Sequence, residues 1–103
     1  MTALGDLVKE LTSGAVEIID LTETLREEYP TITLPPEFGQ ASAFKKEVIS
    51  EYDDRGPMWF WHNISVSEHT GTHFDAPIHW VSGKDLPNNT VDTIPPGDFI
   101  APA

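Results

Sequence analysis

The feature that most constrains this chain is the run from His69 to His79, which reads His-Thr-Gly-Thr-His-Phe-Asp-Ala-Pro-Ile-His. Three of the chain's 4 histidines lie in this run, and an aspartate lies between the last two. A regular helix does not suit these residues. Gly71 lowers helix stability, and Pro77 favours an extended backbone at the residue before it. The run must therefore form a strand or an irregular segment.

A straight strand would place His69, His73, Asp75 and His79 on one face, because all four positions are odd-numbered and strand side chains alternate between faces. His69 and His73 would then lie about 13 Å apart, at roughly 3.3 Å per residue, which is too far for both to reach one metal ion. Gly71 is the residue at which the backbone can turn. We therefore predict a strand that breaks into a curved loop and brings two imidazoles and one carboxylate together.

Imidazole and carboxylate groups are ligands of catalytic zinc, manganese and iron. The alternative is that these residues are ordinary polar side chains of a surface loop. Four candidate ligands of compatible type within one short run favour the metal site over that alternative.

This run matches the pattern His-x-Gly-Thr-His-x-Asp-x-Pro-x-His at every fixed position, and it resembles the motif of the cyclase family of metal-dependent hydrolases, which includes kynurenine formamidase and isatin hydrolase. Two flanking stretches are also similar to that family. Ile18–Thr22, followed by Tyr29-Pro30, resembles its opening strand and loop, and Val91–Ala103 resembles the link into its next core strand.

The resemblance implies an α/β fold with the layered β/β/α architecture of a swivelling-type domain. It further implies that residues 1–103 are the N-terminal part of a single cyclase-family domain, present in incomplete form. The implied activity is metal-dependent hydrolysis of an amide, either an aryl formamide or a cyclic amide. The alternative is a truncated, non-catalytic metal-binding fragment or subunit that associates with another chain.

Carried over residue by residue, the family pattern implies that His69, His73 and Asp75 bind a divalent metal ion, zinc or manganese, and that His79 is the general acid or base. For His79 the alternative is a histidine that only hydrogen-bonds to a ligand. Four aromatic residues are candidates for lining a pocket for a flat aromatic substrate, with ordinary core packing as the alternative: Trp59, Trp61, Phe74 and Trp80.

The composition limits the partners. A formal net charge of -11 repels phosphate backbones and disfavours nucleic-acid binding. The chain has no cysteine, no apolar run of membrane-spanning length and no visible signal peptide, so a cytoplasmic protein without membrane association is expected. We also expect a homo-oligomer or a complementing chain, because the family is usually oligomeric and an incomplete domain exposes apolar strands.

Hydrophobic spacing predicts the elements. Leu4, Leu7, Val8 and Leu11 indicate an amphipathic helix, which Thr2 caps and Gly14 ends. Strands are predicted at Ala15–Leu21, Phe44–Glu51 and Met58–Ser67, with a turn at 53–57 between the last two. In Met58–Ser67 alternate residues form a predicted core face: Met58, Phe60, His62, Ile64 and Val66.

Overall fold

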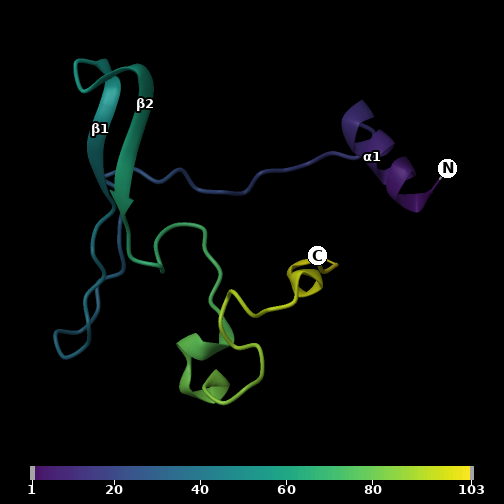
Figure 1. Ribbon diagram of the computed structural model, residues 1–103. Coiled ribbons are helices and arrows are strands. Elements are labelled where there is room, and N and C mark those ends of the chain that lie inside the picture. The colour runs from purple at the N-terminus through teal and green to yellow at the C-terminus, as the bar shows by residue number, and fades with distance from the viewer. Residues whose placement is uncertain (1, 103) are drawn as a thin grey trace.

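The structure is a computed structural model that describes residues 2–102. In chain order it contains helix α1 (Ala3–Ser13), strands β1 (Lys45–Asp53) and β2 (Gly56–Ser65), and three short 3₁₀ helices, η1 (Pro77–His79), η2 (Val81–Gly83) and η3 (Pro96–Phe99). An extended segment separates α1 from the hairpin, and the 3₁₀ helices lie below the open end of the hairpin, away from its turn (Figure 1). No helix of the described residues is long and apolar enough to cross a membrane.

The predicted N-terminal helix and both of its ends are confirmed. The Thr2 hydroxyl accepts a hydrogen bond from the backbone N–H of Gly5 at 3.1 Å, which satisfies one of the free donors of the first turn. Gly14 ends the helix in the left-handed region, with φ 78°. No residue of α1 is buried, so its apolar face is exposed to solvent.

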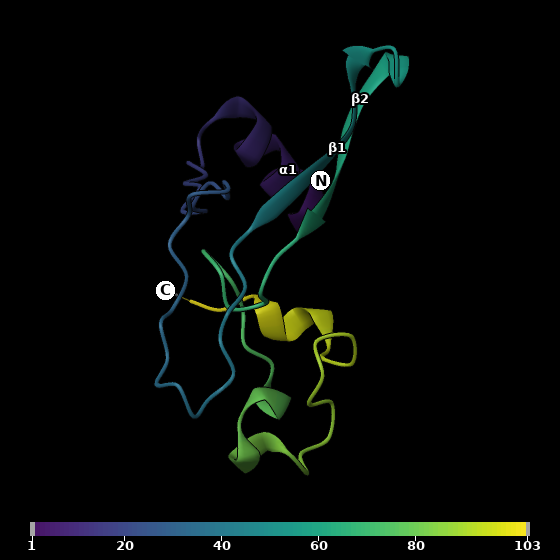
Figure 2. The same cartoon turned by 90° about the vertical axis from the view of Figure 1, so that its left-hand side faces the viewer.

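The predicted strand at Ala15–Leu21 is wrong. The segment forms no sheet ladder, and Ile18 is 75% exposed. A strand needs a neighbouring edge to pair its backbone groups, and the views in Figures 1 and 2 show this stretch running free of the hairpin. The apolar pattern of the segment was therefore not enough to make a strand without a partner.

The two predicted strands that flank the 53–57 turn are confirmed as an antiparallel hairpin. Its register runs from Lys45 opposite Ser65 to Asp53 opposite Gly56, with irregularities between Val48 and Ser50 and between Glu51 and Asp53. The Ser50 side chain is fully buried, and its hydroxyl donates to the Trp59 carbonyl at 2.7 Å. This side-chain bond links the strands at the bulge, where the ladder is interrupted.

The predicted core face of β2 is wrong, because that face is exposed. Met58 is 79% exposed and Ile64 64%, and Phe44 is the buried hydrophobic side chain of the described residues. A two-stranded hairpin cannot cover its own face, and no second layer lies against it here.

The total exposed surface agrees with a chain whose apolar faces are uncovered. It amounts to 8847 Å², whereas a compact 11.4 kDa protein exposes about 5,800 Å². The radius of gyration is 19.5 Å, against about 13 Å for a compact domain of this length.

Candidate active site

The run from His69 to His79 leaves the hairpin as an irregular segment after β2 ends at Ser65. Gly71 has φ 65°, a left-handed conformation, and this confirms the predicted bend. A side chain at Gly71 would also collide with its surroundings, since an added Cβ would lie 2.9 Å from Leu25 Cδ2. The positive φ is the main reason for glycine here, because the partly exposed Leu25 side chain can shift to relieve the contact.

The last histidine is positioned by short 3₁₀ turns. The backbone N–H of His79 donates to the Ala76 carbonyl at 2.9 Å, which closes η1. Asn89 connects this turn to the next one. Its carbonyl accepts from the Ile78 N–H at 2.9 Å, and its side-chain amide donates to the Gly83 carbonyl at 3.0 Å. Sequence reasoning did not single out Asn89. The residue before it, Asn88, has a positive φ of 52°, which is typical of asparagine in turns.

The bend brings the four candidate donors together. His69 Nδ1 lies 2.8 Å from Asp75 Oδ1, and His73 Nε2 lies 3.4 Å from the same oxygen. The rings of His69 and His79 are 4.1 Å apart between centroids. Within residues 2–102, donor atoms of His69, Asp75 and His79 all lie within 4.8 Å of one another, close enough to bind one metal ion.

His73 lies beside this group and is oriented by the backbone. Its Nδ1 is 2.8 Å from the Gly71 carbonyl oxygen. Because a carbonyl only accepts, Nδ1 carries the proton, and the Nε2 lone pair is directed to the side of Asp75. A metal-binding histidine commonly has this arrangement, with one ring nitrogen bonded to a backbone carbonyl and the other free for the ion.

Thr72 joins the bend to an earlier part of the chain. Its hydroxyl accepts a hydrogen bond from the Glu23 N–H at 2.9 Å. Together with Leu25, which lies against Gly71, this bond holds the segment around residues 23–25 beside the bend. The Thr72 hydroxyl therefore binds the backbone of this neighbouring segment.

A cavity of about 590 Å³ opens beside the cluster. The donors His69, His73, Asp75 and His79 form its polar wall. The rest of its lining is mostly apolar and consists of Ile32, Leu34, Phe38, Gly39 and Trp80. Sequence reasoning missed the contribution of the 32–39 segment.

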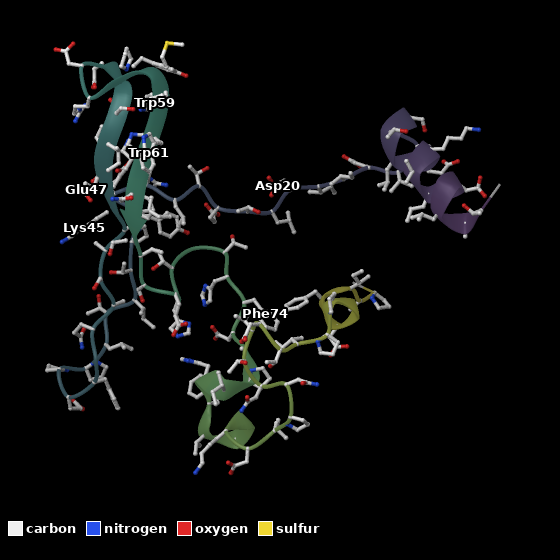
Figure 3. All side chains as sticks on the ribbon, in the orientation of Figure 1. Asp20, Lys45, Glu47, Trp59, Trp61 and Phe74 are labelled. Atoms are coloured by element: carbon white, nitrogen blue, oxygen red, sulfur yellow. The ribbon has the colours of Figure 1, made fainter. Side chains whose placement is uncertain are left out.

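The four aromatic residues predicted to line a substrate pocket lie in different places. Trp80 lines the cavity, with its ring 4.7 Å from that of His79. Trp59 and Trp61 are half exposed on the hairpin, and Phe74 packs on Phe99 with 5.0 Å between ring centroids. Figure 3 shows the two tryptophans high on β2 and Phe74 near the 3₁₀ helices.

Comparison with known proteins agrees with the motif. The family model named Cyclase matches residues 19–103, which is most of the chain. The chain belongs to the cyclase family. The family resemblance read from the His69–His79 run is therefore confirmed.

Several relatives of this cyclase-family chain are isatin hydrolases. The isatin hydrolase of Roseibium aggregatum is 44% identical over 103 residues, a match that covers 98% of this chain and 39% of the relative. The structure of isatin hydrolase A from Ralstonia solanacearum matches with a TM-score of 0.95 and 53% identity, covering 100% of this chain and 39% of that one.

A third match is isatin hydrolase A from Labrenzia aggregata bound to benzyl benzoate. It is 65% identical with a TM-score of 0.87, over 91% of this chain and 37% of that one. The chain thus spans somewhat over a third of the length of the relatives it matches.

Proposed function

We propose that this chain contributes the metal site and part of the substrate pocket of a metal-dependent amide hydrolase. Isatin, a cyclic aromatic amide, is the first candidate substrate, and an aryl formamide such as N-formylkynurenine is the second. The observation that carries the proposal is the cavity itself, which is lined by three imidazoles and a carboxylate together with apolar side chains. The isatin hydrolase relatives support the choice of substrate.

The donor set fits a divalent metal ion, and we assign His69, His73 and Asp75 as its ligands, with zinc or manganese as the ion. The contact of Asp75 with both imidazoles supports this assignment, as does the bond from His73 Nδ1 to the Gly71 carbonyl. When bound, such an ion lowers the pKa of its water and polarises the amide carbonyl.

We assign the proton transfer to His79. Its ring lies 4.1 Å from that of His69 and 4.7 Å from that of Trp80, and it lines the cavity, so it is close to both the proposed ligands and the space for substrate. Hydrolysis adds the oxygen of water to the amide carbonyl carbon, breaks the C–N bond and moves a proton from water to the departing nitrogen. His79 can accept that proton and return it to the nitrogen, because imidazole exchanges protons readily near neutral pH.

We further propose that these residues form part of one layered β/β/α domain and work in an assembly, as a homo-oligomer or with a complementing chain. The support is the exposed apolar surface: α1 buries no residue, and both faces of the hairpin carry exposed aromatic or aliphatic side chains. Exposed apolar area of this extent marks a surface that other polypeptide covers. Light scattering coupled to gel filtration would test this, and a stable, folded monomer would contradict it.

The activity is tested by following the ring opening of isatin and the deformylation of N-formylkynurenine with metal-loaded protein. We expect little turnover from the 103-residue chain alone. We expect metal-dependent turnover once it is assembled with a polypeptide that supplies the rest of a cyclase domain. Metal binding without turnover of either substrate in the assembled form would favour the alternative, a non-catalytic metal-binding subunit. Rapid, chelator-sensitive turnover by the chain alone would show that the rest of the domain is not needed.

A further inference from the structure

The apolar wall of the cavity is carried by a loop that has no regular secondary structure of its own. Ile32, Leu34 and Phe38 all come from the stretch between residues 32 and 39, which belongs to neither the helix nor the hairpin. Such a loop needs specific hydrogen bonds if it is to hold its side chains in one place, because its backbone lacks the regular hydrogen bonds of a helix or sheet.

Gln40 supplies these bonds. Its side-chain amide donates to the Pro35 carbonyl at 3.1 Å and to the Phe38 carbonyl at 3.0 Å, and its oxygen accepts from the Leu34 N–H at 3.4 Å. One side chain therefore engages three backbone groups of the same loop. The segment that these bonds span also contains a tight turn, in which the Phe38 N–H donates to the Pro35 carbonyl at 3.0 Å.

We infer that Gln40 is a positioning residue for substrate recognition: it holds the 34–38 loop so that Leu34 and Phe38 form a preset apolar wall for the aromatic ring of the substrate. This inference rests on the proposed amide-hydrolase function. The loop and the polar cluster line the same cavity, so a flat aromatic amide can place its ring on the loop and its amide at the histidines. A preset wall avoids the cost of ordering the loop when substrate binds.

Two substitutions of Gln40 remove its hydrogen bonds in different ways. In Gln40→Glu the side chain keeps its length and can still accept from Leu34, but it can no longer donate and presents a negative charge to two carbonyl oxygens. Gln40→Met removes all three bonds without adding charge. Glu37→Gln is the matched control, because Glu37 is an exposed residue of the same loop that does not line the cavity.

The experiment measures kcat and KM for isatin and for pyrrolidine-2,3-dione, which keeps the cyclic keto-amide and lacks the benzene ring, in the metal-loaded, assembled enzyme. We expect both Gln40 variants to raise KM for isatin about tenfold. Their kcat, their metal content and their KM for the smaller amide should stay near those of the unsubstituted protein and of Glu37→Gln.

The outcomes separate the inference from the function on which it rests. If the unsubstituted, assembled enzyme hydrolyses isatin and the Gln40 variants show the same KM, the inference is overturned and the proposed function stands. If the Gln40 variants have a kcat that is lowered equally for both amides, Gln40 acts on the catalytic groups and not on recognition of the ring. That result also overturns the inference. If the unsubstituted enzyme hydrolyses neither amide, the proposed function fails first.

Discussion

The hairpin and the His69–His79 run each hold a histidine against a carboxylate at nearly the same distance. His62 Nε2 lies 2.9 Å from Glu51 Oε1 on the hairpin, and His69 Nδ1 lies 2.8 Å from Asp75 Oδ1 in the bend. The pairs differ in their neighbours. Beside His62 the next ring is that of Phe60, at 4.8 Å, whereas beside His69 are two further imidazoles. A histidine–carboxylate pair becomes a candidate metal site through the additional donors around it.

The backbone explains why the two regions differ. In the hairpin, ladder hydrogen bonds hold the strands at a register that many sequences would support. In the bend, individual residues fix the course of the backbone: Gly71 by its positive φ, Thr72 by its bond to Glu23, and Asn89 by its bonds to the η turns. We therefore expect single substitutions in the bend to affect metal binding, and comparable substitutions in the hairpin to leave it unchanged.

The largest effect is expected when two ligands are removed together. His73→Ala combined with Asp75→Ala should reduce the bound metal from about one ion per chain to background, because it leaves a single imidazole of the proposed set. Metal content after dialysis, measured by elemental analysis, tests this.

The matched control removes the other histidine–carboxylate pair, with Glu51→Gln and His62→Gln on the hairpin. This control should retain its metal. Equal loss in both double variants would mean that the comparison between the two regions is wrong.

A smaller effect is expected for Gly71→Ala. Alanine at φ 65° is strained by about 1–2 kcal/mol, and its Cβ would press on Leu25, so metal affinity should fall by roughly 5- to 30-fold. Gly97→Ala is the control, since no atom lies within 4 Å of its added Cβ. Titration of both variants with zinc measures the difference. Equal affinities would show that the bend tolerates a side chain.

A few-fold effect on metal affinity is expected for Thr72→Val, which keeps the shape of the side chain and removes the acceptor for the Glu23 N–H. One hydrogen bond contributes about 0.5–1.5 kcal/mol. Thr72→Ser retains the hydroxyl and should bind zinc as the unsubstituted protein does. If the serine variant is as weak as the valine variant, the methyl group of Thr72 matters and the bond to Glu23 does not.

The smallest effect concerns the hairpin turn. A side-chain hydrogen bond from Arg55 lowers the pKa of Asp53 from 3.8 to about 2. A lowered pKa means that the ionised carboxylate stabilises the turn above about pH 4, and that this contribution is lost as the pH falls towards 2. Both residues are at the surface, so the contribution is small.

An NMR titration of the Asp53 carboxyl tests this, with Arg55→Gln as the comparison. The Asp53 midpoint should return towards its ordinary value in that variant. An unchanged midpoint would contradict the pairing.

Sequence reasoning predicted what depends on local pattern. It placed the helix from Thr2 to Gly14, the hairpin and the bend at Gly71, because caps, alternation and glycine act within a few residues. It failed for Ala15–Leu21, which has no neighbouring strand edge to pair with, and for the core face of β2, which has no second layer against it; a local pattern specifies neither.

For the site, the motif supplied the donor residues but not the apolar residues that line the cavity with them. Ile32, Leu34 and Phe38 reach the cavity through a loop that is held by Gln40, and no spacing rule connects residues 32–40 with residues 69–79. Long-range contacts of this kind follow from the fold and not from periodicity.

The most direct test of the central assignment compares His73→Ala with His79→Ala, because the nitrogen atoms of both lie close to Asp75. Metal content and turnover of isatin should be measured on the same assembled enzyme. We predict that His73→Ala loses the ion, while His79→Ala keeps it and loses about 10² to 10⁴ in rate, as expected for a general acid or base. If His79→Ala loses the ion as completely as His73→Ala does, His79 is a ligand and the assignment of roles is contradicted.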